Sequence, residues 1–111
     1  MTIKLVSTPS LIGKGEITEI NLPDQLGIGS NVLGSFKLKN IGTAEAEFRI
    51  LISPQWYSTK YSASGVLPIG STLTASLGSG QIIMPDHDAV IIIEAQRLYE
   101  GSWVVDDTKS H

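Results

Sequence analysis

Apolar and polar residues alternate along several short stretches of this chain, and this period of two limits the possible folds more than any other feature. Around residue 37, Phe36 and Leu38 fall on one side of the chain, while Lys37 and Lys39 fall on the other. Successive side chains of a β-strand point to opposite faces of a sheet. The stretch 32–38 therefore predicts a strand with one buried face and one solvated face.

The same alternation recurs along the rest of the sequence, with glycine and proline between the alternating stretches. Further strands are predicted over residues 3–6, 15–20, 46–52, 72–77, 89–97 and 102–105, and residues 55–61 form either a short aromatic strand or an extended loop. The strand over 89–97 is expected to be central and buried on both faces at residues 90–93. About seven strands at a spacing near ten residues, without a long helical stretch, indicate an all-β antiparallel sandwich.

Turn-forming residues predict how some of these strands connect. Residues 40–43, Asn-Ile-Gly-Thr, are expected to form a turn that joins 32–38 to 46–52 as a β-hairpin, because Asn and Gly tolerate positive φ. Glu100 and Gly101 are expected to turn the chain into the last strand. Residues 106–111 are polar, and we expect this tail to fray.

Length and charge set further limits. A chain of 111 residues has room for one domain, spanning 1–111. The net charge of −3 argues against binding to a nucleic-acid backbone, which requires a cationic surface. Cysteine is absent, so disulfides, thiolate metal sites and cysteine nucleophiles are excluded. No apolar run has the length of a signal-peptide core or a membrane span. We expect no membrane insertion, and these features do not specify a cellular compartment.

Three short segments carry a resemblance to a known group of modules. They are Phe36-Lys37-Leu38-Lys39-Asn40-Ile41-Gly42-Thr43-Ala44 with Phe48-Arg49-Ile50, Leu67-Pro68-Ile69-Gly70-Ser71, and Met84-Pro85-Asp86-His87-Asp88-Ala89-Val90-Ile91-Ile92. They resemble the CARDB modules and the wider immunoglobulin-like and fibronectin type III-like group. The resemblance implies an immunoglobulin-like β-sandwich with a noncatalytic adhesion or spacer role, on an extracellular surface or a virion.

Two acidic clusters are candidates for metal chemistry. His87 lies between Asp86 and Asp88, and imidazole and carboxylate groups bind divalent metals or orient a general base. Neighbours along an extended chain point in opposite directions, so a solvated turn is the favoured interpretation. Asp106 and Asp107, with Asp24 or Asp86, are candidates for a calcium site, but calcium requires six to eight oxygen ligands.

The chain has few of the signatures that nucleophilic enzymes carry. A Gly-x-Ser-x-Gly elbow is absent, and the glycine-rich segments lack the lysine of a phosphate-binding loop. We therefore expect that the chain is not an enzyme and needs no cofactor. A small hydrolase or metal enzyme around His87 stays as the third hypothesis.

The aromatic cluster Trp56, Tyr57 and Tyr61 is the most informative binding candidate, because aromatic residues make up 6% of the whole chain. In a strand, Trp56 points to one face, and both tyrosines point to the other. Flat aromatic rings with polar ends suit sugar stacking or a protein contact. The competing interpretation buries Trp56 between the sheets and leaves the tyrosines half-buried.

Two functions follow as expectations. The first is a noncatalytic immunoglobulin-like interaction module, an assembly or adhesion unit of a surface or a virion. Its partner is a protein or a second copy of the chain, bound by edge pairing or face packing. The alternative is a carbohydrate-binding module that uses Trp56, Tyr57 and Tyr61 as an aromatic platform.

Overall fold

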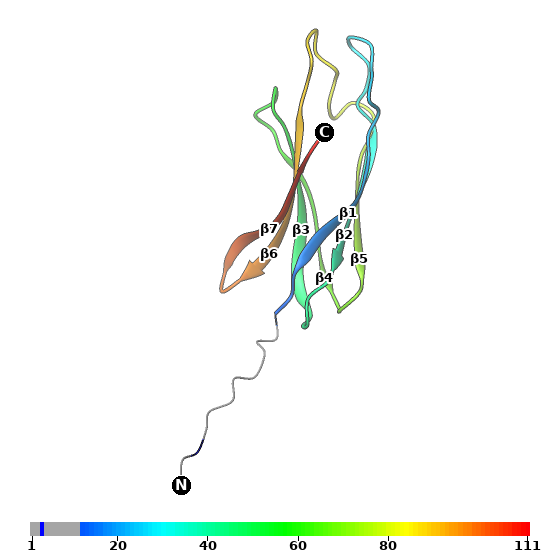
Figure 1. The fold of residues 1–111 in the computed structure, drawn as a ribbon. Coiled ribbons are helices and arrows are strands. Elements are labelled where there is room, and N and C mark those ends of the chain that lie inside the picture. The colour runs from blue at the N-terminus through cyan, green and yellow to red at the C-terminus, as the bar shows by residue number, and fades with distance from the viewer. Residues whose placement is uncertain (1–2, 4–11) are drawn as a thin grey trace.

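The computed structural model describes residues 3 and 12–111, which form seven β-strands in two antiparallel sheets and no helix (Figure 1). The strands are β1 (Gly15–Asn21), β2 (Gly34–Asn40), β3 (Ala46–Pro54), β4 (Tyr61–Leu67), β5 (Thr72–Leu77), β6 (Ile91–Tyr99) and β7 (Ser102–Ser110). One sheet has the order β1-β2-β5, and the other has the order β4-β3-β6-β7. The prediction of an all-β fold with about seven strands in two sheets is confirmed.

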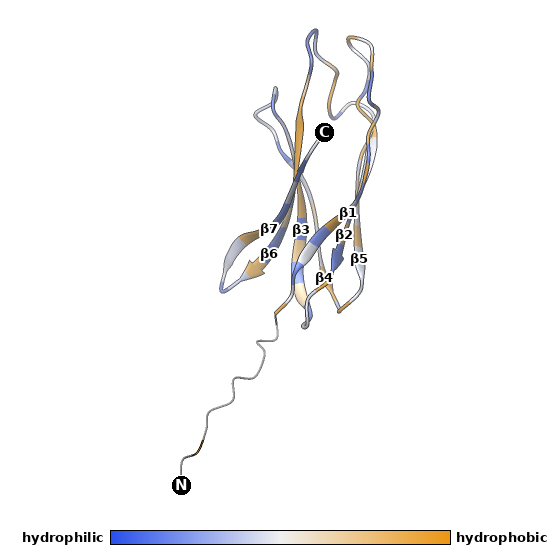
Figure 2. Cartoon of the chain, in the orientation of Figure 1, coloured by the Kyte–Doolittle hydropathy of each residue, from blue (hydrophilic) through white to orange (hydrophobic). Residues whose placement is uncertain are grey.

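The core lies between the two sheets and is built from the apolar half of each alternating strand. The strands contribute the fully buried side chains of Phe36, Leu38, Phe48, Ile50, Ile52, Ile93 and Ala95, and the connection between β5 and β6 adds Ile82. The orange and blue bands along β1 and β3 in Figure 2 follow this alternation. Each large side chain removed from water contributes about 1.5–3 kcal/mol to folding, so the inward residues hold the sheets together.

The predicted hairpin between 32–38 and 46–52 is wrong. β2 pairs with β1 and β5, whereas β3 pairs with β4 and β6, so the two strands lie in different sheets. Both strands have fully buried inner faces, and packing these faces against each other buries more apolar surface than a hairpin does. Residues 41–45 cross from one sheet to the other. The alternation is the same in either arrangement, because it reports which face is buried and not which strand is the neighbour.

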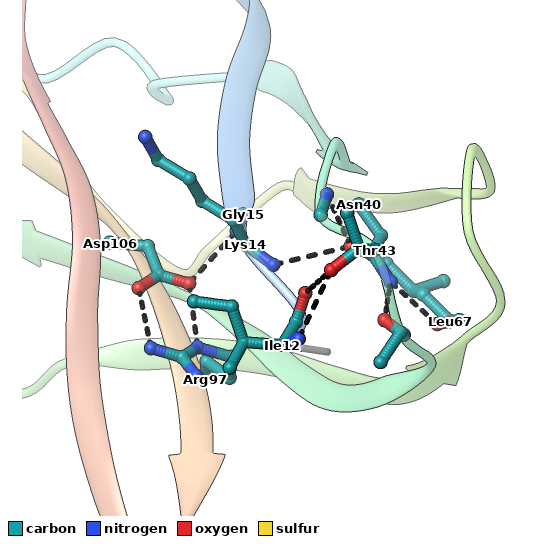
Figure 3. Close-up of polar contacts among 10 residues, drawn as sticks. Ile12, Lys14, Gly15, Asn40, Thr43, Leu67, Arg97 and Asp106 are labelled. Atoms are coloured by element: carbon teal, nitrogen blue, oxygen red, sulfur yellow. Dashed lines mark hydrogen bonds and ion pairs between the residues drawn. The ribbon is translucent and has the colours of Figure 1, made fainter. Parts of the chain in front are cut away.

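Asn40 anchors this crossing through its side chain (Figure 3). Its Oδ1 accepts hydrogen bonds from the backbone N–H of Lys14 (3.3 Å) and Gly42 (3.0 Å). Its Nδ2 donates to the carbonyl oxygens of Ala44 (2.9 Å) and Leu67 (3.0 Å). The residue is fully buried, and its φ is not positive. The sequence-based explanation for this position, a left-handed turn residue, is therefore wrong.

Gly42 is required by a close approach rather than by its own φ. A Cβ added at this position would lie 2.4 Å from the carbonyl oxygen of Ile12 and 2.5 Å from the backbone nitrogen of Lys14. The neighbouring hydrogen bonds, from Ile41 N to Lys14 O and from Thr43 N to Ile12 O, hold the crossing against residues 12–14. Any side chain at position 42 would push these segments apart.

The polar end of the chain is a strand, so the predicted frayed tail is also wrong. β7 continues to Ser110, and a β-bulge against β6 places the side chains of Asp106 and Asp107 on the same side. Asp106 Oδ2 accepts a hydrogen bond from Gly15 N, and Asp107 Oδ2 accepts one from Ile17 N, both at 2.9 Å. The two carboxylates thus bind the outward N–H groups of edge strand β1 and join the two sheets.

Asp106 also forms an ion pair with Arg97 (Figure 3). The Nε and Nη2 atoms of Arg97 lie 3.1 and 3.3 Å from the two carboxylate oxygens. The side chains of Arg97 and Asp106 are 14% and 8% exposed, so the pair is largely shielded from water. Loss of either partner would leave a poorly solvated charge.

Several smaller predictions need correction. β4 is a strand that the alternation does not reveal, because Ala63 and Gly65 on its inner side give almost no hydrophobic signal. Residues 55–60 form a loop, which was one of the two alternatives predicted for residues 55–61, whereas Val90 is 47% exposed rather than buried as predicted. The strand predicted over 3–6 lies, apart from its first residue, outside the described residues. Glu100 and Gly101 form the predicted turn, and both have positive φ.

Replacement of Asn40 by alanine should lower the free energy of unfolding by about 2–4 kcal/mol, because it leaves buried backbone groups without partners. Urea unfolding followed by circular dichroism measures the change. The exposed neighbour Lys39, replaced by alanine, is the control, with a change below about 0.5 kcal/mol. Equal losses in the two variants would contradict the anchoring role of Asn40.

Asp106→Asn should destabilise the protein more than Asp107→Asn does. Asp106→Asn removes the charge that faces the shielded Arg97, at an expected loss of about 3 kcal/mol, whereas Asp107→Asn retains a neutral acceptor for Ile17 N and costs about 1 kcal/mol. Unfolding in urea at neutral pH measures both losses. A larger loss for Asp107→Asn would show that the ion pair is not the dominant contact.

Candidate functional site

The three predicted aromatic residues meet around one short segment of the connection between β5 and β6. Trp56 Nε1 donates a hydrogen bond to Ile83 O (3.1 Å), and Tyr57 Oη accepts one from Ile83 N (3.1 Å). Tyr61 Oη donates to Gln81 O (2.7 Å). The predicted split of these side chains over two faces does not occur, because residues 55–60 are a loop. The cluster holds the segment 81–83 in place.

A cleft of about 300 Å³ opens beside Trp56, between the β1–β2 connection, the loop after β3 and the β5–β6 connection. Its apolar lining includes Leu22, Leu26, Val32, Trp56, Met84 and Ile91. The polar residues of the cleft are Asp24, Gln25 and His111, and His111 Nε2 lies 3.2 Å from Asp24 Oδ1. The volume is at the lower end of the range for small-ligand pockets, about 300–1,000 Å³. The hydrogen bond from Trp56 Nε1 to Ile83 O fixes the orientation of the indole ring at the cleft.

The outer surface of the four-stranded sheet is the second candidate. We call it the β3–β6 face; its residues are Glu47, Arg49, Leu51, Ser62, Ser64, Val66, Glu94, Gln96, Leu98, Trp103, Val105 and Thr108. The guanidinium carbon of Arg49 lies 4.4 Å from the ring centroid of Trp103, a cation–π contact, and Nε of Arg49 donates to Oε1 of Gln96. Leu51 and Leu98 are half-buried, whereas Val66 is 60% exposed and Val105 is 48% exposed.

The outer surface of the three-stranded sheet differs from the β3–β6 face. It carries Glu16, Glu19, Lys37, Lys39, Thr72, Thr74 and Ser76. Lys37 Nζ forms an exposed ion pair with Glu19 Oε2 at 3.0 Å. This surface is polar throughout, as expected for a sheet face in water. Apolar side chains on an outer sheet surface are therefore concentrated on one side of the molecule.

The residues that the sequence suggested as metal ligands do not come together in one site. Asp86, His87 and Asp88 are exposed in a loop, where Nδ1 of His87 lies 2.7 Å from the carbonyl oxygen of Asp88. Across residue 3 and residues 12–111, no three His, Asp or Glu side chains group in a way that would hold a metal ion.

The residues considered for calcium are separated as well. The carboxylates of Asp106 and Asp107 face β1, while Asp24 lies beside His111 at the cleft. The carboxylates of Asp24, Asp86, Asp106 and Asp107 thus do not form one site.

Among residues 3 and 12–111, the structure contains no helix that could span a membrane.

Comparison of the chain with protein-family models, with curated proteins and with solved structures finds no significant match.

Sequence reasoning did not single out the β3–β6 face as a site. The sequence feature that could have revealed this face is the outward half of the alternating strands, since Arg49 and Leu51 alternate with the core residues of β3. Trp103 packs on this face against Arg49. The alternation identified each outward position, but the pairing of β3 with β6 was needed to bring those positions together.

Proposed function

We propose that this chain is a noncatalytic interaction module of the immunoglobulin-like class, an assembly or adhesion unit whose contact surface is the β3–β6 face. In chain order, the constant-type immunoglobulin sandwich places strands one, two, four and five in one sheet and strands three, six and seven in the other. The orders β1-β2-β5 and β3-β6-β7 support the assignment, whereas β4 departs from this pattern because it lies beside β3 and not beside β5. The resemblance of residues 36–50 to CARDB modules points to the same class.

The observation that carries this proposal is the contrast between the two outer sheet surfaces. The three-stranded sheet presents lysine, glutamate, threonine and serine, whereas the β3–β6 face adds the aliphatic side chains of Leu51, Val66, Leu98 and Val105 to its polar residues and carries Arg49 stacked on Trp103. Tryptophan and arginine are enriched among the residues that dominate protein–protein binding energy. A sheet surface that combines aliphatic residues with a stacked arginine and tryptophan has the composition of a contact surface.

Leu51→Lys should weaken self-association by at least about tenfold, because it places a charge at the centre of the β3–β6 face. Sedimentation velocity from about 1 µM to about 500 µM measures the association of the wild-type chain and its variants. Thr74→Lys adds the same charge to the other outer surface and should leave association unchanged. A strictly monomeric wild-type chain, or equal effects of the two variants, would count against this contact surface.

The cleft beside Trp56 supports a second candidate function, carbohydrate binding. Aromatic faces stack on the apolar faces of sugars, and Asp24, Gln25 and His111 supply polar groups for hydroxyls. The hydroxyls of Tyr57 and Tyr61 are bonded to backbone groups, so Trp56 is the residue of the predicted platform that remains best placed for stacking.

The Trp103→Phe variant provides a test, because Trp56 is then the sole tryptophan. Binding of a soluble oligosaccharide should shift the emission of Trp56 with a Kd of about 1 mM or below. Trp56→Phe should abolish binding when it is measured by calorimetry. No emission change with any member of a panel of plant, bacterial and animal oligosaccharides would rule out this candidate.

A further inference from the structure

None of the charged residues of the β3–β6 face has a charged partner in the described part of the chain; they are Glu47, Arg49 and Glu94. The ion pairs there are Lys37–Glu19 and Arg97–Asp106, and the imidazole of His111 lies beside the carboxylate of Asp24. Arg49 uses Nε to bond Gln96, and its guanidinium plane contacts Trp103. Arg49 and Glu94 are both half-buried. Charges in such surroundings gain from an opposite charge supplied across an interface.

The register of β3 and β6 arranges four side chains at the corners of a quadrilateral. Arg49 pairs with Gln96, and Leu51 pairs with Glu94. Arg49 and Glu94 therefore occupy one diagonal, and Leu51 and Gln96 occupy the other. A two-fold axis in the plane of the face, along the Leu51–Gln96 diagonal, brings the corner of Arg49 in one copy close to that of Glu94 in the other. The β3–β6 face is thus complementary in charge to a copy of itself.

We propose that the β3–β6 face binds the same face of a second copy of this chain, with Arg49 of each copy against Glu94 of the other. The strands of the two copies cross at close to a right angle, which is one of the two preferred arrangements of packed sheets. Leu51 meets its own counterpart on the axis, as an isologous interface requires. This inference rests on the proposed function and specifies its partner.

The size of the face predicts a reversible dimer. Four strands about 4.8 Å apart, one of 7 residues and three of 9 residues at about 3.3 Å per residue, cover roughly 500 Å² per copy, or roughly 1,000 Å² in the dimer. Stable complexes bury about 1,200–2,000 Å². The dimer therefore falls among the weak interfaces, in which two charge pairs in register decide whether the copies associate.

Two charge reversals test the pairing. Arg49→Glu alone places glutamates against each other, and Glu94→Arg alone places arginines against each other, so each variant should dimerise at least about tenfold more weakly than wild type.

An equimolar mixture of the two variants restores both charge pairs. The glutamate introduced by Arg49→Glu in one chain faces the arginine introduced by Glu94→Arg in the other. The unchanged Glu94 of the first chain faces the unchanged Arg49 of the second. The mixture should form a heterodimer with a Kd within about threefold of the wild-type value, measured by sedimentation equilibrium.

Lys37→Glu is the matched control, because it reverses the same charge on the polar surface of the other sheet and should not change association. Thermal unfolding of each variant checks the fold, since Arg49 also contacts Trp103 and Gln96 within one copy. A variant that fails to fold is replaced by Arg49→Gln and Glu94→Gln, which remove the charges; each should weaken the dimer, and their mixture should not recover.

The outcomes separate this inference from the proposed function. If the wild-type chain associates, Leu51→Lys weakens association, and the mixed reversals do not rescue it, the Arg49–Glu94 pairing is overturned and the contact surface stands. If neither reversal weakens the dimer, the pairing is likewise overturned. If the wild-type chain is monomeric up to about 500 µM, both the pairing and the self-associating surface fail.

Discussion

The buried side-chain amide of Asn40 is the contact on which the arrangement of the two sheets depends. Its four hydrogen bonds join the start of β1, the crossing between β2 and β3, and the end of β4. A polar group without contact with water is costly unless all its hydrogen bonds are made, and here protein atoms supply all of them. The amide thus selects the one path of residues 41–45 that satisfies it. That path places β2 and β3 in opposite sheets, with Phe36 against the same core as Phe48.

The consequence for function is that β3 lies between β4 and β6 in the larger sheet and gives that sheet an outward row of Glu47, Arg49 and Leu51. β6 adds Glu94 and Gln96 beside this row, and β7 adds Trp103. The proposed contact surface therefore exists because the chain crosses after Asn40. A hairpin at that point would place Lys37 and Lys39 of β2 beside Arg49, and the resulting face would be strongly cationic.

Period-two alternation predicted the strands with large inward residues, such as Phe36 and Leu38 in β2 and Ile50 and Ile52 in β3, together with the two-sheet architecture. It did not predict β4, where small residues at 63 and 65 hide the inner face, or the strand at residues 106–110, where the inward residues are carboxylates. Asp106 and Asp107 resemble a solvated tail in the sequence because the backbone groups that they bind are about 90 residues away.

In the candidate sites, too, some features are visible in the local sequence and others arise only from long-range contacts. The aromatic cluster was visible in the sequence, but its bonds to residues 81–83 depend on the loop at 55–60 and on the path between β5 and β6. The corners formed by Arg49, Glu94, Leu51 and Gln96 depend on strand pairing. Local composition reports which residue types are present on a surface, whereas long-range register decides which of them become neighbours.

The bulge in β7 has a consequence for how the molecule meets other copies of itself. By directing two consecutive carboxylates toward β1, it gives the N–H groups of Gly15 and Ile17 acceptors from within the chain. An incoming strand would have to displace these acceptors and would meet two negative charges, so growth of a continuous intermolecular sheet along this border is disfavoured. Association through a flat face about a two-fold axis, by contrast, ends with two subunits. The bulge thereby protects a chain rich in β-structure from polymerisation along β1.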